Sequence, residues 1–382
     1  MKTQIIYSSS VIGHNLEYLH HIYEVCLSKK HLNFVFLVPC SFLKYKNRFY
    51  WEESNNIIFE FIPEEQLTKK QNSSIFLRSI YLCKILKKCF KRHSTNRAFS
   101  TNIIELLPWA PFILKKARIS GIMYILSYFY HSDYSSIKLL KSKLINRILI
   151  KSSIFNKILL LNDHIIPQTL NNRNNYNRFI ALADPLPPNP SGKIINLRES
   201  LGISADKKIF LHIGGLGIRK GTLDIIDSFN YIPKDIIQTY CFLFIGRISQ
   251  SIKEIFTKKI NYWKSKGLQI IVEDGGYCSY ERFYSMCNTS DVILIPYKNV
   301  YQSSGVLGFA AYAKKPVIGP DKGLLANLIS NYQLGICIDT TPENLSKTYE
   351  KAVAFKVNTD KAQNYLIANS LYSFKQTIYN ML

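Results

Sequence analysis

The stretch FLHIGGLGIRKGTLDIIDSF, Phe210 to Phe229, begins as an apolar run and ends in a helical pattern, with three glycines and the tripeptide RKG between them. Glycines permit the tight backbone paths and positive φ angles that a short turn needs. A helix that opens behind such a turn offers free N–H groups and the positive end of its dipole to an anion. Arg219 and Lys220 add a guanidinium fork and a point charge that suit phosphate oxygens. The segment therefore predicts either a phosphate-binding turn or a solvated connection that happens to carry two cations.

A second turn of this kind lies further along the chain, in PYKNVYQSSGVLGFAAYAKKPVIGPDKG, Pro296 to Gly323. The apolar run VILIP ends at this loop, and QSSG then opens an apolar helix of small residues. Ser303, Ser304 and Gly305 could offer hydroxyl and N–H groups to a phosphate at the start of that helix. The alternative is a cap that satisfies only its own helix.

Short β-branched or aromatic runs alternate with helical patterns along the whole chain, which predicts parallel sheets covered by helices on both faces. We expect two doubly wound, Rossmann-like α/β domains that face one another across a cleft, with ligands at the carboxyl ends of the strands. Strands are expected at 4–8, 33–38, 57–62, 157–162, 178–183, 208–214, 241–246, 269–273, 292–296, 316–319 and 335–338. Helices are expected at 15–29, from 222, from 280, at 305–314 and at 342–355.

The 382 residues are too many for one ordinary core and suit two domains. The boundary is expected in ADPLPPNPSGKI, Ala183 to Ile194, because its four prolines cannot continue a helix or a central strand. We therefore expect an N-terminal, acceptor-side domain over residues 1–185 and a C-terminal donor domain over 186–360. A last helix over 361–382 is expected to pack back on the N-terminal domain.

Positive charge is concentrated in one quarter of the chain. Residues 66–160 hold 18 lysines and arginines against 2 acidic residues, within a chain of net charge +23. Such a field attracts lipid headgroups, nucleic acid or phosphorylated substrates. The segment 75–92 places Lys84, Lys87, Lys88 and Lys91 on one arc of a helix, with Leu82, Leu86, Cys89 and Phe90 opposite, and 136–153 has the same character. These basic amphipathic helices suit an anionic membrane surface, or else their apolar faces pack on the domain.

The eight cysteines contain no C-x-x-C pair, and several lie inside apolar runs. This pattern favours reduced, buried thiols in a cytoplasmic protein over a disulfide frame or a zinc site. The N-terminus has no long apolar segment of the signal-peptide type. The longest candidate membrane run, ISGIMYILSYFYHS, has 14 residues, whereas a span needs about 20. We therefore expect a protein that is soluble or lies peripherally on the inner face of the cytoplasmic membrane.

The two turns together resemble the donor domain of GT-B glycosyltransferases, and most of all glycosyltransferase family 4, the glycosyl transferases group 1. The family pattern G-R-L-x-x-x-K-G is similar to GGLGIRKG here, with Lys220 in the lysine position. The block VILIPYKNVYQSSGVLGFAAYAKKPVIGPDKG is similar to the family's second motif, and IIVEDGGYCSYERFYSMCNTSDVILIP resembles the segment that faces the nucleotide base. The resemblance covers residues 209–355 well and the first half only in outline.

Several positions depart from the family pattern. Gly215 stands where the family has an arginine, and Arg219 could supply that charge from four residues on. The two family glutamates, of which the second usually binds the nucleotide ribose, fall at Tyr301 and Phe309, and a later one at Asn327. A divergent subgroup that uses QSSG for the same task is favoured over a weakened site, because the surrounding block is intact.

The resemblance implies the site residues. The donor would be bound by Gly13, Gly214, Gly215, Glu273, Tyr277, Ser303, Ser304 and Gly305. The catalytic candidates are His14, His131, Arg219 and Lys220. Glu17 and Asp133 would contact the acceptor. The alternative for His14 and His131 is a surface or packing role. That alternative is favoured more strongly for His20 and His21, which lie a turn further into the first helix.

The expected function is sugar transfer from a UDP- or GDP-sugar to a saccharide or lipid-linked saccharide in bacterial-type surface glycan synthesis. The family implies a retaining reaction. No cofactor or metal is expected, and the absence of a D-x-D motif argues against a metal-dependent GT-A enzyme. Two alternatives are a degenerate GT-B protein that binds nucleotide sugars without turnover and a basic nucleic-acid-binding protein. The second is disfavoured, since no RRM or KH signature is present and the cations alternate with aliphatic residues.

Overall fold

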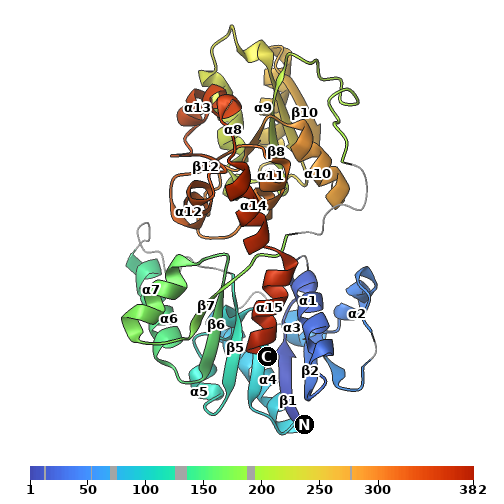
Figure 1. The fold of residues 1–382 in the computed structure, drawn as a ribbon, viewed down its shortest axis with the longest axis vertical. Helices are drawn as coiled ribbons and strands as arrows, with labels where there is room; N and C mark the ends of the chain where they lie inside the picture. The colour runs from blue at the N-terminus through green and yellow to red at the C-terminus, as the bar shows by residue number, and fades with distance from the viewer. Residues whose placement is uncertain (13, 53, 69–74, 125–135, 187–193, 276–277) are drawn as a thin grey trace. The chain divides into compact units, whose positions relative to one another are not determined.

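The computed structural model describes residues 1–12, 14–52, 54–68, 75–124, 136–186, 194–275 and 278–382 (Figure 1). These residues form two compact units. Unit 1 comprises Met1–Ala183 and Tyr372–Leu382, and unit 2 comprises Asp184–Leu371. The predicted residues Gly13, Tyr277, His131 and Asp133 lie outside the described residues.

Unit 1 is built on a seven-stranded parallel sheet in the order β3-β2-β1-β4-β5-β6-β7. Its strands are β1 (Lys2–Tyr7), β2 (Leu32–Pro39), β3 (Ile57–Ile62), β4 (Arg97–Ser100), β5 (Arg118–Met123), β6 (Phe155–Leu161) and β7 (Phe179–Leu182). The five strands expected in this half are confirmed, whereas β4 and β5 were not anticipated. Strand β5 takes up the start of the run considered above as a membrane candidate, and its residues from Ile119 to Met123 are buried between neighbouring strands.

Helices cover the sheet of unit 1. They are α1 (His14–Ser28), α2 (Phe42–Tyr45), α3 (Glu64–Thr68), α4 (Ile75–Arg92), α5 (Ala110–Ile113), α6 (Ser136–Lys151), α7 (Ile165–Asn174) and α15 (Leu371–Met381), with 3₁₀ turns η1 (Lys46–Arg48) and η2 (Ile103–Leu106). The core of the unit joins Leu19 and Ile22 of α1 to Phe36 of β2 and to Phe374 and Ile378 of α15. The last helix of the chain is therefore part of the core of unit 1.

Helix α4 has the two faces that the sequence predicted. The lysines at 84, 87, 88 and 91 are exposed, and Leu82, Leu86, Cys89 and Phe90 are buried. The apolar face thus packs on the unit, as in the second of the two interpretations given above. Among the described residues no helix combines the length and the apolar character that a membrane span requires.

Unit 2 is built on a six-stranded parallel sheet in the order β10-β9-β8-β11-β12-β13. Its strands are β8 (Lys208–Ile213), β9 (Tyr240–Ile245), β10 (Gln269–Glu273), β11 (Val292–Leu294), β12 (Val317–Pro320) and β13 (Gly335–Ile338), so all six predicted strands are confirmed. The strand order reverses beside β8, which pairs with β9 on one side and with β11 on the other. In open α/β sheets ligands bind at such a point, outside the carboxyl ends of the strands.

The helices of unit 2 are α8 (Thr222–Ser228), α9 (Lys253–Ser265), α10 (Tyr280–Thr289), α11 (Gly305–Ala313), α12 (Gly323–Asn331), α13 (Pro342–Ala354) and α14 (Thr359–Ala368), with η4 (Ile218–Lys220), η5 (Phe229–Tyr231) and η6 (Ile237–Thr239). An aromatic core holds α8 and α13 against the sheet. In it, Tyr349 of α13 lies 4.7 Å from Phe210 of β8, measured between ring centroids. The segment expected as one final helix forms two: α14 belongs to unit 2 and α15 to unit 1 (Figure 1).

Candidate functional site

The glycine-rich turn follows β8 and is held in a strained but glycine-compatible path. Gly214 and Gly221 have φ angles of +110° and +69°, which are left-handed values that favour glycine. Gly221 is the residue before α8, and the helix begins at Thr222 as expected. Thr222 is the first residue of the helix, and its side chain does not cap it. Its Oγ1 instead accepts a hydrogen bond of 2.8 Å from the Gly217 N–H, so it ties the turn back onto the helix.

The second turn docks directly onto the first. The Lys298 N–H donates to the Arg219 carbonyl at 3.0 Å, and Arg219 Nη1 donates to Gln302 Oε1 at 3.1 Å. The approach is closest at Gly221, where an added Cβ would lie 2.2 Å from the Pro296 carbonyl oxygen. The two turns that the sequence singled out separately therefore form one structure inside unit 2.

Lys220 points into the second turn. Its Nζ lies over the ring of Tyr297, 3.5 Å from the ring centroid, which is a cation–π contact. Tyr297 is buried, and its hydroxyl lies 3.5 Å from Ser304 Oγ. One aromatic side chain thus links the predicted cation of the first turn to the predicted serine of the second, and sequence analysis did not single it out.

Ser303, Ser304 and Gly305 lie at the start of α11. Ser304 is the residue before the helix, and its side chain makes no capping hydrogen bond to the helix backbone. Its hydroxyl contacts Tyr297 instead, so the interpretation as a simple helix cap does not describe this serine. Gly305 is exposed, which leaves the first N–H groups of α11 near the surface.

A buried histidine connects β8 to β11 and to the start of α8. His212 of β8 contacts the Leu294 carbonyl through Nδ1 at 2.9 Å and Thr222 Oγ1 through Nε2 at 3.0 Å. Since a carbonyl only accepts, Nδ1 carries the proton, and Nε2 accepts from the threonine hydroxyl. Burial lowers the pKa of His212 to about 4; the hydrogen bond to Leu294 opposes this shift and the nearby Lys220 charge adds to it. In the sequence, the signal that could have identified His212 is a polar residue inside an apolar strand pattern.

Glu273 lies at the same edge of the sheet. Its carbonyl accepts from the Gly246 N–H at 2.9 Å, and the Gly214 N–H in turn donates to the Ile245 carbonyl. The carboxylate of Glu273 is paired with Arg282, whose Nη2 lies 2.5 Å away. Glu273 therefore lies at the same end of the sheet as the glycine-rich turn, with β9 between them, and its carboxylate is paired with an arginine.

Tyr301 and Phe309, the positions of the family glutamates, are both buried. Phe309 of α11 stacks on Phe283 of α10 with ring centroids 4.0 Å apart, and Tyr284 packs on its edge. An aromatic cluster thus occupies the region where the family pattern has a carboxylate. Asn327, the third departure, lies in α12 and is partly exposed.

In unit 1 the described part of the predicted site is small. His14 begins α1, and Glu17 lies in the first turn of that helix with an oxygen 4.0 Å from His21 Nε2. His20 stacks on Phe49 with centroids 4.6 Å apart, and its Nε2 contacts the Tyr50 carbonyl at 2.8 Å. These contacts favour a packing role for His20.

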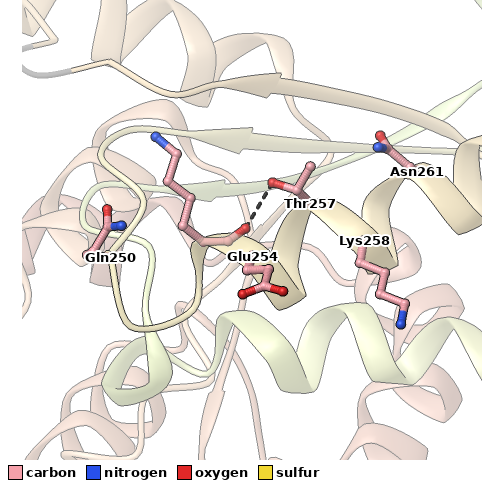
Figure 2. A pocket seen from close by; sticks show the side chains of 6 residues that line it. Gln250, Glu254, Thr257, Lys258 and Asn261 are labelled. Atoms are coloured by element: carbon pink, nitrogen blue, oxygen red, sulfur yellow. Dashed lines mark hydrogen bonds between the residues drawn. The ribbon is translucent and has the colours of Figure 1, made fainter.

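A surface hollow elsewhere in unit 2 holds none of the predicted site residues. It is lined by Gln250 and by one side of α9 (Figure 2), with the residues Lys253, Glu254, Thr257, Lys258 and Asn261. The Thr257 hydroxyl donates to the Lys253 carbonyl in the same helix at 2.9 Å. The hollow is therefore a feature of a solvated helix surface, and no residue of the paired turns lines it.

Two groups of side chains among the described residues have the chemistry and spacing to hold a metal ion. They are His20, His21 and Glu24, and Glu60, Cys89 and His93. Both groups lie in unit 1, so neither belongs to the paired turns of unit 2.

Comparison with known proteins gives the fold of the chain and a family model that matches part of it. Residues 193–370 match the family model described as Glycosyl transferases group 1. No curated protein matches the chain. Among solved structures, WaaG, a glycosyltransferase involved in lipopolysaccharide biosynthesis, is 14% identical with a TM-score of 0.65, and the match covers 100% of this chain and 99% of that one.

Other solved structures share the fold at similar identity. HepE from Anabaena, solved in complex with UDP, is 12% identical with a TM-score of 0.66, and the match covers 100% of this chain and 99% of that one. A glycosyltransferase from Rickettsia africae is 14% identical with a TM-score of 0.65, covering 100% and 98%. At this level of identity the likeness shows the fold, which is the two-domain, Rossmann-like GT-B fold that the sequence predicted.

Proposed function

We propose that this chain, whose residues 193–370 match the glycosyl transferases group 1 model, is a glycosyltransferase that moves a sugar from a nucleotide donor to a saccharide or lipid-linked saccharide acceptor. The observation that carries the proposal is the docking of Arg219 and Lys220 onto the second turn, through Gln302 and Tyr297. In this proposal the two cations, held beside the start of α11, bind the diphosphate of the donor.

The chemistry follows from the charge that develops during transfer. As the bond between the sugar and the diphosphate breaks, negative charge builds on the leaving phosphate oxygens. Cations and N–H groups that are already in place stabilise this charge without reorganisation. In this proposal Arg219 and Lys220 supply the charges, and Gly214, Gly215, Ser303, Ser304 and Gly305 supply backbone and hydroxyl donors.

The remaining roles extend the proposal to the rest of the predicted site. Glu273 and Tyr277 would contact the nucleoside and Gly13 the donor, with His14 and His131 in the catalytic region and Glu17 and Asp133 toward the acceptor. HepE has been solved with UDP and with UDP-glucose, which supports UDP-sugars as the first donors to test, with GDP-sugars next. The role of WaaG in lipopolysaccharide biosynthesis supports an acceptor in a bacterial surface glycan, and we infer a retaining reaction from the family.

We also propose that unit 1 contacts an anionic membrane surface from the cytoplasmic side. The support comes from exposed side chains at the start of α4 and on α6, namely Phe76, Leu77, Leu140 and Leu144. Lys141 Nζ lies 5.6 Å from the Phe76 ring centroid, so the two helices present apolar and basic groups together. Flotation with anionic vesicles should recover the protein, and a Leu77→Glu, Leu140→Glu variant should float less. Equal flotation with neutral and anionic vesicles would contradict this contact.

The central test is the double variant Arg219→Ala, Lys220→Ala. Turnover of the donor that binds, found by thermal shifts with a panel of UDP-, GDP- and TDP-sugars, should fall by about 10²-fold or more. The control is Lys258→Ala, Lys264→Ala, which removes the same charge from exposed positions of α9. A folded Arg219, Lys220 double variant with unchanged turnover would remove these cations from the mechanism.

The same assays separate the alternatives. The aromatic cluster around Phe309 favours a protein that binds nucleotide sugars without turnover, and donor binding with neither transfer nor hydrolysis would support that function. Salt-sensitive RNA binding without any nucleotide-sugar binding would instead support a nucleic-acid-binding role.

A further inference from the structure

A carboxylate, a thiol and an imidazole meet in unit 1, between β3 and the end of α4. Cys89 and His93 are one helical turn apart, because the His93 N–H donates to the Cys89 carbonyl at 3.1 Å and continues the helix. Cys89 Sγ lies 3.6 Å from Glu60 Oε2, and His93 Nε2 hydrogen-bonds Glu60 Oε1. The three ligand-type atoms all lie within 4.8 Å of one another.

These are ligands that zinc takes in proteins. A tetrahedral zinc with Zn–S about 2.3 Å and Zn–O about 2.0 Å holds its sulfur and oxygen ligands about 3.5 Å apart. The distance between Cys89 Sγ and Glu60 Oε2 is 3.6 Å, so this pair needs little movement to bind one ion. We propose that Glu60, Cys89 and His93 form a zinc site that joins the edge strand β3 to α4, with water as the fourth ligand.

The surroundings suit ion entry and ligand orientation. Cys89 is buried, whereas the side chains of His93 and Glu60 are 19% and 22% exposed, so an ion can reach the site from solvent. Arg92 Nη2 lies 2.5 Å from Glu60 Oε2. A carboxylate has lone pairs enough for an arginine and a metal together, and metal-bound carboxylates are commonly hydrogen-bonded by an outer partner. Zinc would carry two positive charges against the thiolate and the carboxylate, and the thiol proton would leave to solvent.

The other group of ligand-type residues fits less well. That group contains no thiolate, the ligand that zinc binds most strongly among those present. The structure thus favours Glu60, Cys89 and His93, and the two groups can be told apart by a signal that only sulfur gives.

The test uses the full-length, reduced and metal-free protein, and Co²⁺ as a spectroscopic substitute for Zn²⁺. Titration with Co²⁺ should produce a thiolate-to-cobalt charge-transfer band that saturates at one equivalent and disappears when Zn²⁺ is added. Zn²⁺ alone should raise the melting temperature of the protein, because it binds the folded state. Neither readout depends on sugar transfer. The zinc site can therefore be disproved while the proposed function holds, and the proposed function can be disproved while the zinc site holds.

Variants assign the ligands. Cys89→Ser should abolish the band, and His93→Gln and Glu60→Gln should each weaken metal binding by about tenfold or more. Cys40→Ser is the matched control, because it removes a cysteine of unit 1 that belongs to neither group, and it should leave the band intact. His93 is partly exposed, so His93→Gln keeps the test decisive if Cys89→Ser does not fold. Absence of the band, or metal binding lost only in His21→Gln, would overturn the site.

Discussion

Tyr297 is the residue through which the two turns of unit 2 depend on each other. Its ring lies under the Lys220 ammonium, and its hydroxyl lies beside Ser304. A cation over an aromatic face is stabilised by about 0.5–2 kcal/mol, and the ring also fixes where the ammonium points. Tyr297 is therefore a positioning residue for the proposed diphosphate site.

We predict that Tyr297→Leu raises the dissociation constant for UDP or the preferred nucleoside diphosphate by about 3- to 30-fold. Tyr297→Phe keeps the ring and should bind almost as well as the natural protein. In a Lys220→Ala background the leucine substitution should have little further effect, because the cation that it misplaces is gone. Isothermal titration measures all five affinities, including that of Lys220→Ala alone, and equal losses in the phenylalanine and leucine variants would contradict this role.

His212 should make stability depend on pH. Its folded-state pKa is lowered to about 4, below the value of about 6.5 in the unfolded chain. The unfolded state therefore binds the proton more readily, and stability is lost as the pH falls from about 6.5 toward 4. Between pH 7.5 and 5.0 this contribution is about 2 kcal/mol, which urea unfolding at both pH values can measure. His212→Asn should lose this part of the pH dependence, and an unchanged profile would show that His212 does not cause it.

At the scale of single residues, the sequence predicted the cations and serines of the site but not the side chains that hold the two turns in position. Arg219, Lys220 and Ser304 stand out by residue type beside glycines. Tyr297 and His212 act through contacts made by strands β8 and β11, which are adjacent in the sheet but far apart along the chain. The order of residues along the chain does not show which strands become neighbours in the sheet.

Among the elements, the turn between η4 and α8 is the one whose shape the second turn constrains most tightly. Gly221 combines a left-handed φ of +69° with a Pro296 carbonyl oxygen only 2.2 Å from an added Cβ. Gly202 offers a matched control, since its φ is +63° and nothing lies within 4 Å of its added Cβ. The two glycines share the backbone strain, and only Gly221 has the clash.

We therefore predict that Gly221→Ala destabilises the protein more than Gly202→Ala. The left-handed conformation alone costs about 1–2 kcal/mol in each variant. In Gly221→Ala the clash should also separate the two turns, which should destabilise the protein further and weaken nucleoside diphosphate binding. Gly202→Ala should leave this binding unchanged. Urea unfolding and titration calorimetry on both variants give the comparison. Equal effects on stability and binding would mean that the second turn does not hold the first.

Strand and helix prediction succeeded where a pattern is complete within one segment. All six strands of unit 2 follow from short apolar runs, and the start of α8 follows from the glycine-rich turn after the first of them. The strands β4 and β5 were missed for different reasons: β4 has an arginine and a serine at its ends and so shows no continuous apolar run, and β5 begins a longer apolar run that was considered as a membrane segment. The zinc ligands Glu60 and Cys89 come from two elements 29 residues apart, so no cysteine spacing could indicate them.

For the whole molecule, the decisive feature is that the chain returns to unit 1. Phe374 and Ile378 of α15 are fully buried in the core of that unit, and Lys375 pairs with Glu24 of α1. Unit 1 is thus assembled from both ends of the described chain, with unit 2 inserted between them.

We predict that Phe374→Ala destabilises unit 1 by about 3–5 kcal/mol, the usual cost of deleting a buried aromatic ring. Hydrogen exchange followed peptide by peptide should accelerate in β1 and β2 while peptides of β8 and β9 keep their protection. Tyr372→Ala is the control, because that side chain is 76% exposed. If Phe374→Ala loosens both units alike, α15 is not specific to unit 1.

The same return of the chain sets an order of events during synthesis. Met1–Ala183 leave the ribosome long before Tyr372–Leu382 are made. Until then, the surface of Met1–Ala183 that packs against α15 stays uncovered. Unit 2 is complete in the nascent chain earlier than unit 1 is. The part of the protein translated first is therefore the last to reach its final form.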